Sequence, residues 1–202
     1  MHLDALLADE SISLTALEDA LERASPSERC AALLALGRAA QRRLYRRAAA
    51  ARPLTLGDFV PPERAPGEPV RHFGKNTLPL PRPLRFFEKR FSRPESASAR
   101  LFGYNQTPVV RLIGPGYFVA EPAAPDSAWA ERGAVVVDYF RVPDGPVPSG
   151  WPPVVPNSRG LQRFVYGGTR DFMRRVSRHV TIGAAYKGES ALDHYFVLVR
   201  EE

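Results

Sequence analysis

The chain has 202 residues, of which 44% are hydrophobic and 25% charged, a composition typical of one globular domain or of a domain with an appended segment. This composition argues against a disordered chain, and no apolar run approaches the roughly 18 residues that a membrane-spanning helix needs. A single cysteine, Cys30, excludes an internal disulfide and a cysteine-based metal site. The start of the chain lacks the basic and apolar regions of a secretory signal, so we expect a cytoplasmic protein.

The net charge of +6 is compatible with nucleic acid, anionic lipid or acidic ligands as partners. The abundance of Ala, Arg and Pro is also what a biased base composition produces, so charge alone does not predict nucleic-acid binding. The 20 prolines, about twice the average usage, predict regular structure in short pieces, because proline interrupts helices and central strands.

Residues 1–52 are predicted to form a helical hairpin. Thr15-Ala16-Leu17-Glu18 has the pattern of a capping box, and Ser25-Pro26-Ser27-Glu28 repeats it with proline at the first helical position. The second helix is expected to continue to Pro53. Its last turns carry arginines, which suit the negative end of a helix dipole, and docking on a protein or a nucleic acid is the alternative interpretation. These residues are Arg42, Arg43, Arg46, Arg47 and Arg52.

Residues 53–100 are predicted to form a proline-rich, basic segment that covers a β-domain, with 53–202 as one structural unit. Gly74-Lys75-Asn76-Thr77 is similar to the end of a phosphate-binding loop, but Pro79 excludes the helix that such a loop requires. The three prolines that begin there recur at every second residue, whereas peptide-docking motifs space them three apart. A stiff strip remains, with Leu84, Phe87 and Phe91 at helical spacing and with His72, Lys75 and Asn76 at its rim.

Residues 101–202 have the pattern of an antiparallel β-barrel-like domain, because short apolar strands alternate with turn residues and no long helix intervenes. The predicted fold class is therefore α+β, with the helical hairpin packed on an antiparallel β-barrel-like or strongly curved sheet. Asp171–Val176 is predicted to be a helical turn or a bent connection, and 143–158 a long loop. The predicted strands are Pro108–Ile113, Tyr117–Glu121, Ala134–Val142, Leu161–Tyr166, Val180–Tyr186 and His194–Arg200.

Asp138 is the carboxylate of the strongest predicted strand. Strand alternation puts it on the same face as Val136 and Phe140, and a buried charge needs a cation or several hydrogen-bond donors. One interpretation is a pocket carboxylate with a raised pKa, which would act as a catalytic base. The other, which we favour, is an internal salt bridge to an arginine or a lysine, or a register that is wrong by one residue.

The histidines and the cysteine form no recognisable chemical motif. His179 and His194 begin the two strands of one predicted hairpin, but no carboxylate or cysteine stands beside them at a metal-ligand spacing. We therefore predict no metal site. Cys30 lies in a helix rich in Ala and Leu and is expected to be a structural thiol rather than a nucleophile.

The last 40 or so residues contain a strand ending in tyrosine (Phe164-Val165-Tyr166), an Asp-Phe connection (171–176), a strand with an inner glycine (Ile182-Gly183) and a closing strand (195–200). This order resembles the C-terminal pattern of small lipocalin-like (calycin-type) bacterial barrel domains of unknown function. The resemblance covers about a fifth of the chain, which lacks the Gly-x-Trp-x-Gly signature near the barrel start. It implies a barrel or strongly curved sheet whose interior holds an apolar ligand.

Our leading hypothesis is a protein that binds a small, largely apolar molecule, either neutral or anionic, in a β-barrel-like pocket. One alternative is a cofactor-independent cyclase or isomerase with Asp138 as base and His72 or a tyrosine as acid. Another is an interaction module that uses the basic helical hairpin. The sequence predicts neither a cofactor nor an oligomeric state. The candidate ligand-binding residues are Tyr117, Asp138, Tyr139, Tyr166, Asp171, Arg174, His72, Lys75 and Asn76.

Overall fold

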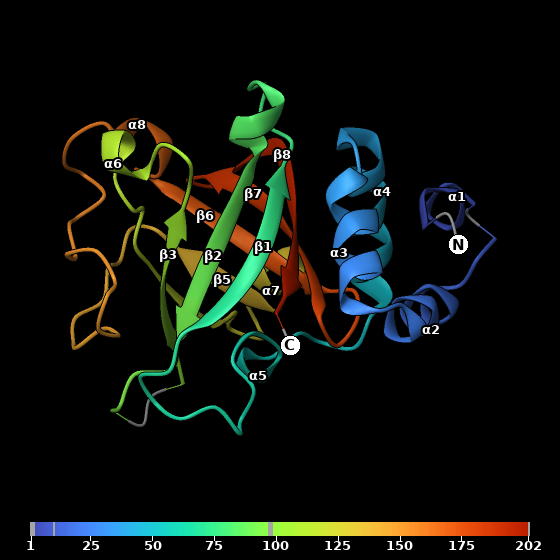
Figure 1. Ribbon diagram of the computed structural model, residues 1–202, viewed down its shortest axis with the longest axis horizontal. Coiled ribbons are helices and arrows are strands. Elements are labelled where there is room, and N and C mark those ends of the chain that lie inside the picture. Colours follow the sequence, from blue (N-terminus) through green and yellow to red (C-terminus); the bar gives the residue numbers. More distant parts are fainter. Residues whose placement is uncertain (1–2, 10, 97–98, 202) are drawn as a thin grey trace.

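A computed structural model describes residues 3–9, 11–96 and 99–201. Its eight antiparallel strands close into a barrel in which each strand pairs with its neighbours in sequence and β8 pairs with β1 (Figure 1). The α+β fold class predicted from the sequence is thereby confirmed. The strands are β1 (Val70–Asn76), β2 (Phe86–Ser92), β3 (Leu101–Gln106), β4 (Phe118–Pro122), β5 (Val135–Asp138), β6 (Thr169–Arg175), β7 (Val180–Lys187) and β8 (Ser190–Arg200).

The N-terminal helices pack against one side of the barrel. The predicted capping box at Ser25 is confirmed, because its hydroxyl accepts from the N–H of Glu28 and the Glu28 carboxylate accepts from the N–H of Ser25. The one predicted at Thr15 is wrong, since the N-cap is Ser13. The predicted second helix is two helices, because the backbone at Leu36 leaves the helical region. The helices are α1 (Leu3–Ala8), α2 (Leu14–Arg23), α3 (Pro26–Ala35), α4 (Arg38–Arg47) and the 3-10 turn η1 (Ala48–Ala50).

A second hydrophobic core lies between these helices and the outer faces of β7 and β8. Leu33 of α3 and Leu44 of α4 are fully buried there. On the barrel side, Ile182 and Val197 supply the facing apolar surface. The outward side chains of β7 and β8 that face the helices are therefore apolar, which fixes the helices on this side.

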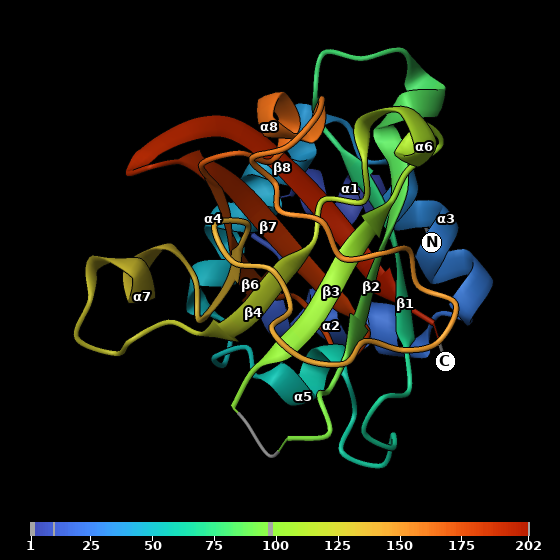
Figure 2. The same cartoon turned by 90° about the vertical axis from the view of Figure 1, so that its left-hand side faces the viewer.

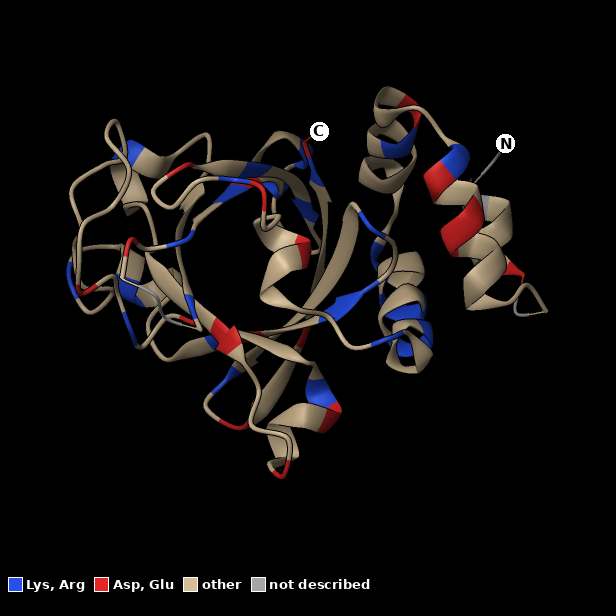
Figure 3. Ribbon diagram, turned by 90° about the horizontal axis from the view of Figure 1, so that it is seen from below, with Lys and Arg blue, Asp and Glu red and all other residues tan. Residues whose placement is uncertain are grey.

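A short helix, α5 (Leu56–Phe59), precedes β1, and other short helical turns occupy the connections between strands: η2 (Arg82–Arg85), α6 (Val110–Ile113), α7 (Ala128–Arg132) and α8 (Gln162–Val165). We call the end of the barrel at which β1, β3, β5 and β7 finish the upper end, as drawn in Figure 1. The upper connections are 77–85 with η2, 107–117 with α6, 139–168 with α8, and the tight turn between β7 and β8. At the lower end, α5 lies across the mouth of the barrel (Figure 3).

Side chains fill the inside of the barrel. Phe91, Phe118 and Phe196 are inward residues of three different strands and are buried in one core cluster. Glycines give these rings their space, since a Cβ at Gly103 would lie 2.4 Å from the Phe118 ring and one at Gly183 2.3 Å from the Phe196 ring. An eight-stranded barrel is just wide enough for side chains to fill it or for one small ligand.

The segment predicted to cover the β-domain, 53–100, contributes two of the barrel's own strands, β1 and β2. The spacing of Phe87 and Phe91 was interpreted as helical, but both are inward positions of β2, separated by Lys89. A lysine between two phenylalanines hides the apolar alternation that indicates a strand. The proline-rich stretch that we interpreted as a stiff strip is the connection between these two strands.

Three other predicted elements have the wrong type. Pro108–Ile113 and Leu161–Tyr166 were predicted to be strands, but they contain α6 and α8. Both are short apolar runs, for which periodicity does not separate strand from helix. Asp171–Val176 was predicted to be a helical turn or a bent connection, but most of it belongs to β6, whose inward face carries the charged residues Asp171 and Arg175.

Candidate functional site

A group of polar side chains lies inside the upper part of the barrel. We call Lys89, Asn105, Tyr139 and Asp171 the upper cluster. Lys89 of β2 is directly opposite Asn105 of β3, and Asp171 of β6 is opposite Val137 of β5. Strand alternation puts Lys89, Asn105 and Asp171 on the same side of the sheet as the apolar core. Tyr139 directly follows β5, and all four side chains are buried. The upper part of the barrel therefore encloses one ammonium, one carboxylate, one amide and one phenol.

Hydrogen bonds connect every member of the upper cluster. The Lys89 ammonium donates to an Asp171 oxygen at 3.1 Å and to the Tyr139 hydroxyl. The same hydroxyl lies 3.2 Å from Asp171 Oδ2, to which it donates, and accepts from the Asn105 amide at 3.1 Å. Asn105 also donates to the carbonyl of Gly116 at 3.0 Å, which ties the cluster to the upper connection 107–117.

Aromatic rings surround the ammonium of Lys89. Its Nζ lies 4.8 Å from the ring centre of Phe118, 4.9 Å from that of Tyr139 and 5.0 Å from that of Phe196. Rings at such distances attract a cation through their quadrupole, more strongly where water is excluded. The site thus combines one desolvated cation with an aromatic wall.

Burial shifts the ionisation of all three titratable groups in the upper cluster. It lowers the pKa of Lys89, although the charge of Asp171 opposes this shift. Burial also raises the pKa of Asp171, against the charge and hydrogen bond of Lys89. The pKa of Tyr139 lies well above its usual value, because of burial and then the nearby Asp171 charge. Perturbed groups that share a buried site are a recognised sign of function, although structural ion pairs have the same effect.

The connection 139–168 closes the upper end, and we call its residues 156–168 the cap. The ring of Tyr166 stacks on that of Tyr139, with ring centres 5.3 Å apart and planes 19° apart. Asn157 donates to the carbonyls of Tyr117 and Tyr139 at 2.7 and 2.8 Å. Gln162 accepts from the N–H of Gly116 at 3.3 Å. Three buried side chains therefore hold the cap over the upper cluster.

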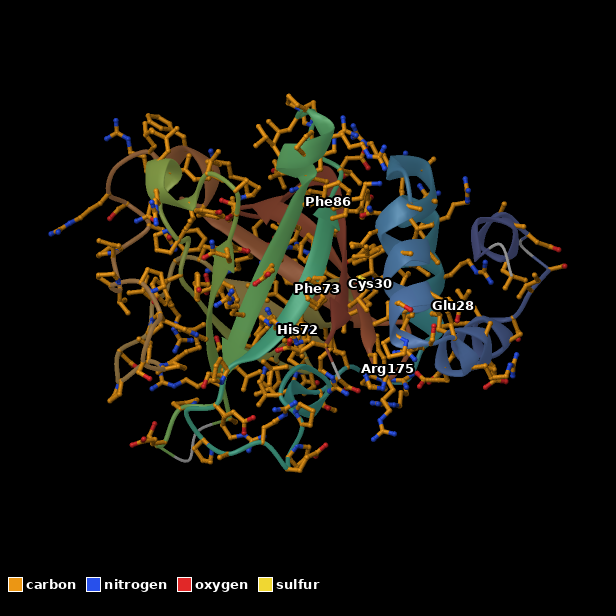
Figure 4. The ribbon with its side chains drawn as sticks, in the orientation of Figure 1. Glu28, Cys30, His72, Phe73, Phe86 and Arg175 are labelled. Atoms are coloured by element: carbon orange, nitrogen blue, oxygen red, sulfur yellow. The ribbon has the colours of Figure 1, made fainter. Side chains whose placement is uncertain are left out.

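A second polar group lies at the lower end, around α5. His72 of β1 is inward and buried, and its Nε2 lies 3.0 Å from the carbonyl of Phe59 (Figure 4). Burial lowers the pKa of His72 to about 3. Arg200 donates to the Asp58 carbonyl at 3.0 Å, and Arg175 lies 3.7 Å from the Asp58 carboxylate. Burial alone would raise the pKa of Asp58, but hydrogen bonds from Arg52 and Thr55 lower it.

The structure brings together three of the candidate ligand-binding residues, Tyr139, Tyr166 and Asp171. Asp138 lies on the outward face of β5, where its carboxylate is 3.2 Å from Arg170 and accepts from the N–H of Phe140. This is the internal salt bridge that we favoured. Its partner gives no support to Asp138 as a catalytic base, and His72 is on the other side of the barrel wall.

The remaining candidates lie away from the upper cluster. Tyr117 is buried against Tyr104 and Trp151 on the outside of the barrel. Arg174 is outward and donates to the carbonyls of Tyr45, Glu131 and Arg132. Lys75 donates to the carbonyl of Ala35, and the side chain of Asn76 accepts from the N–H of Leu78.

Sequence reasoning missed Lys89 and Asn105. A signal for Lys89 was present, because alternation along β2 puts it on the face of Phe87 and Phe91, as the same argument put Asp138 on an apolar face. For Asn105 the pattern held no such signal, since it stood outside the predicted strands.

Two cavities of the structure lie outside the barrel. One, of about 220 Å³, is between η1, α7 and β6, and the other, of about 370 Å³, is near Pro94, Phe102 and Pro146 at the lower end. Within 3–9, 11–96 and 99–201, no group of three or more His, Cys, Asp or Glu residues is placed to hold a metal ion. Over the same residues, no helix combines the length and apolar character needed to cross a membrane.

Comparison with known proteins gave no relative from which a role could be transferred. No protein-family model matches the chain, and no curated protein and no solved structure matches it. The resemblance to lipocalin-like domains therefore stays a prediction, and the function has to be argued from the geometry of the barrel.

Proposed function

We propose that the upper part of the barrel binds a small, largely apolar molecule that carries one uncharged hydrogen-bond acceptor, such as a carbonyl or ether oxygen. The observation that carries the proposal is the position of the Lys89 ammonium. It has three donors, and in the described part of the chain its hydrogen-bond partners are Asp171 and Tyr139. A ligand oxygen would satisfy the third donor, and the rings of Phe118 and Phe196 would contact the apolar part.

The charge of the site selects between a neutral and an anionic ligand. Lys89 and Asp171 form either an ammonium with a carboxylate or, if the proton moves across, a neutral amine with a neutral carboxylic acid. The net charge of the pair is zero in both forms. An anion would gain the attraction of Lys89 but would meet the repulsion of Asp171 at a similar distance. Burial of a further uncompensated charge is costly. A neutral acceptor avoids this cost.

A ligand would reach the upper cluster when the cap lifts. The inside of the barrel is filled by side chains, so the proposal does not involve a deep, permanently open cavity. The cap is attached by Asn157, Gln162 and Tyr166 rather than by a strand ladder. Connections of this kind open at a lower free-energy cost than core strands do. The resemblance to lipocalin-like domains, which implies an apolar ligand inside the barrel, agrees with this position.

Three ligands of similar shape test the proposal: 2-acetylnaphthalene, 2-naphthoate and 2-methylnaphthalene. They present the same rings with an uncharged acceptor, an anion and no acceptor. We expect 2-acetylnaphthalene to bind at least about tenfold more tightly than the other two, since one satisfied hydrogen bond to a charged donor contributes about 1.5–3 kcal/mol. Binding is measured by two-dimensional NMR titration, with shifts expected at the amides of Asn105, Tyr139 and Tyr166.

The control is the double variant K89M/D171N, which removes the ammonium without leaving a buried carboxylate unpaired and keeps an acceptor for Tyr139. This variant should bind the ketone and the hydrocarbon equally. The proposal is wrong if none of the three ligands shifts the interior resonances. It is also wrong if the preference for the ketone persists in K89M/D171N.

A further inference from the structure

The exposed apolar side chains of this protein are gathered at one end of the barrel. Among the described residues, six large hydrophobic side chains are exposed, and every one belongs to an upper connection. Leu112 of α6 and Phe164 of α8 are the most exposed, each at 70%. Isolated apolar residues on a surface are ordinary, but a concentration of them indicates a binding surface. The six are Leu80, Leu112, Phe140, Leu161, Phe164 and Val165.

The same connections are basic and almost free of acidic residues. Residues 77–85, 107–117 and 145–168 contain neither Asp nor Glu. Two acids of the upper connections remain: Asp144 lies at the lower end, where it pairs with Arg100 at 2.8 Å, and Glu189, in the turn between β7 and β8, pairs with Arg132 at 2.8 Å. Arginines flank the apolar tips and are exposed: Arg82, Arg111, Arg159 and Arg163.

Two views place these tips on separate projections around the upper end. In Figure 1, η2 stands apart from α6 and α8, whereas Figure 2 separates α8 from α6 and η2. Each projection carries at least one exposed apolar side chain and one exposed arginine. The two cavities described above lie elsewhere, one beside η1 and α7 and the other at the lower end. Three projections that each carry an arginine and an apolar side chain suit a broad, fluid surface, because such a surface can contact all of them at once.

We propose that this upper rim, formed by residues 77–85, 107–117 and 156–168, docks on an anionic lipid bilayer. The apolar tips insert among the lipid headgroups, and the arginines pair with lipid phosphates and carboxylates. Membrane-surface binding grows with buried apolar area and with attraction to anionic lipid, and the rim supplies both. The alternative of a second copy of the chain is disfavoured by charge, because a two-fold dimer through this rim would set arginines against arginines with no acid between them.

Docking of this kind would place the cap and the upper cluster against the bilayer. Gln162 and Tyr166 face the barrel from α8, while Phe164 and Val165 of the same turn face solvent. Insertion of the exposed side would therefore act on the element that closes the barrel. The inference rests on the surface alone and stands whether or not the barrel binds a ligand.

Vesicle cosedimentation of the full chain tests the proposal. The probes are vesicles of phosphatidylcholine alone and of an equimolar mixture of phosphatidylcholine and phosphatidylserine. We expect binding to the mixed vesicles that weakens with added salt, and little binding to phosphatidylcholine. The rim variants R111E/R163E and L112S/F164S should each lose at least about tenfold in affinity. Because all four side chains are exposed, the thermal unfolding of both variants should match that of the natural sequence.

The control is R23E/R46E, which makes the same change in net charge at exposed positions of α2 and α4. It should bind mixed vesicles as the natural sequence does. Three results would overturn the proposal: no binding to mixed vesicles, an equal loss in R23E/R46E, or full binding by both rim variants. A fourth is a dimer in sedimentation equilibrium without lipid that L112S/F164S dissociates, because a second copy would then cover the rim.

Discussion

The two ends of the barrel both enclose charged groups, but they close in different ways. At the lower end, α5 inserts Phe59 beneath β1 and β2, where its ring lies 4.7 Å from that of Phe91. At the upper end, the cap is laid over the upper cluster and is held by side chains of a long connection. The lower closure thus inserts a fully buried ring into the hydrophobic core, whereas the upper closure joins the same core through Tyr166 and is otherwise held by a few polar contacts.

The surfaces of the two ends differ in the opposite sense. The lower connections carry acids interspersed with arginines, as in the pairs Arg52 with Asp58 and Arg64 with Glu68. Among the described residues, the upper rim has arginines for which no salt bridge to an acid is formed, and it carries all of the exposed large apolar side chains except Phe140. A surface of mixed charge is the ordinary solvated exterior, while the rim combines positive charge with exposed apolar side chains, which water disfavours. From this difference we infer that the lower end contributes mainly to the stability of the fold and that the upper end is the binding end.

The largest effect on stability is expected at the lower end, from the Phe59 ring of α5. Replacing Phe59 by alanine removes a fully buried ring and leaves a cavity that α5 and β1 cannot close, which should cost about 4 kcal/mol of unfolding free energy. Urea unfolding measures it. The matched substitution at the upper end, Phe164→Ala, removes an exposed ring and should cost less than about 0.5 kcal/mol. Equal losses in the two variants would remove the distinction between the ends.

A smaller but still large effect is expected from the upper cluster. Lys89→Met leaves the buried carboxylate of Asp171 without its cation and should destabilise by about 3 kcal/mol. The double variant K89M/D171N removes both charges and should recover most of that loss, because an ion pair replaced as a unit is often nearly neutral. Unfolding free energies of the two single variants and the double variant give the coupling directly.

Additive losses in that cycle would mean that Lys89 and Asp171 do not act as a pair. Recovery in the double variant would instead mean that the pair is dispensable for folding. In that case the burial of two charges in a core calls for another reason, and ligand binding is the reason that we propose.

The sequence predicted the frame of this molecule better than its site. Ser25-Pro26-Ser27-Glu28 marks a helix start by local hydrogen bonding, and the β7–β8 hairpin follows from apolar strands on both sides of Lys187-Gly188. Such signals are local and survive in any context. β1, β2 and β6 were missed because His72, Lys89 and Asp171 take inward positions and break the apolar alternation.

The upper cluster was beyond local reasoning for a related cause. Lys89, Asn105 and Asp171 come from three strands, and Tyr139 directly follows a fourth, β5. A closed barrel brings them together only through the register of all the ladders between them. Tyr139 and Asp171 were named as candidates, but nothing in the sequence paired them with Lys89. A charged residue on an apolar strand face is a signal for a buried partner, and the partner's identity needs the fold.

The lower end should also show a pH dependence that comes from His72. Its folded pKa is lowered to about 3, whereas the unfolded chain titrates near the usual 6.5. Below pH 6.5 the unfolded state therefore binds a proton that the folded state does not, and the stability that is fully present above this pH is lost as the pH falls. The slope should be about 1.4 kcal/mol for each pH unit, ending where the folded histidine also protonates.

The variant His72→Gln isolates this contribution, because an amide can donate to the Phe59 carbonyl as the imidazole does but does not titrate. Urea unfolding between pH 7 and pH 4 should show the natural sequence losing stability faster than the variant, and the two curves should become parallel above about pH 6.5. Parallel curves throughout would mean that the imidazole is accessible to water or to an acid in the folded state. The lower end would then open to solvent, as the upper end is proposed to do. In that case α5 would not be a more rigid closure than the cap, and the proposed difference between the two ends would be wrong.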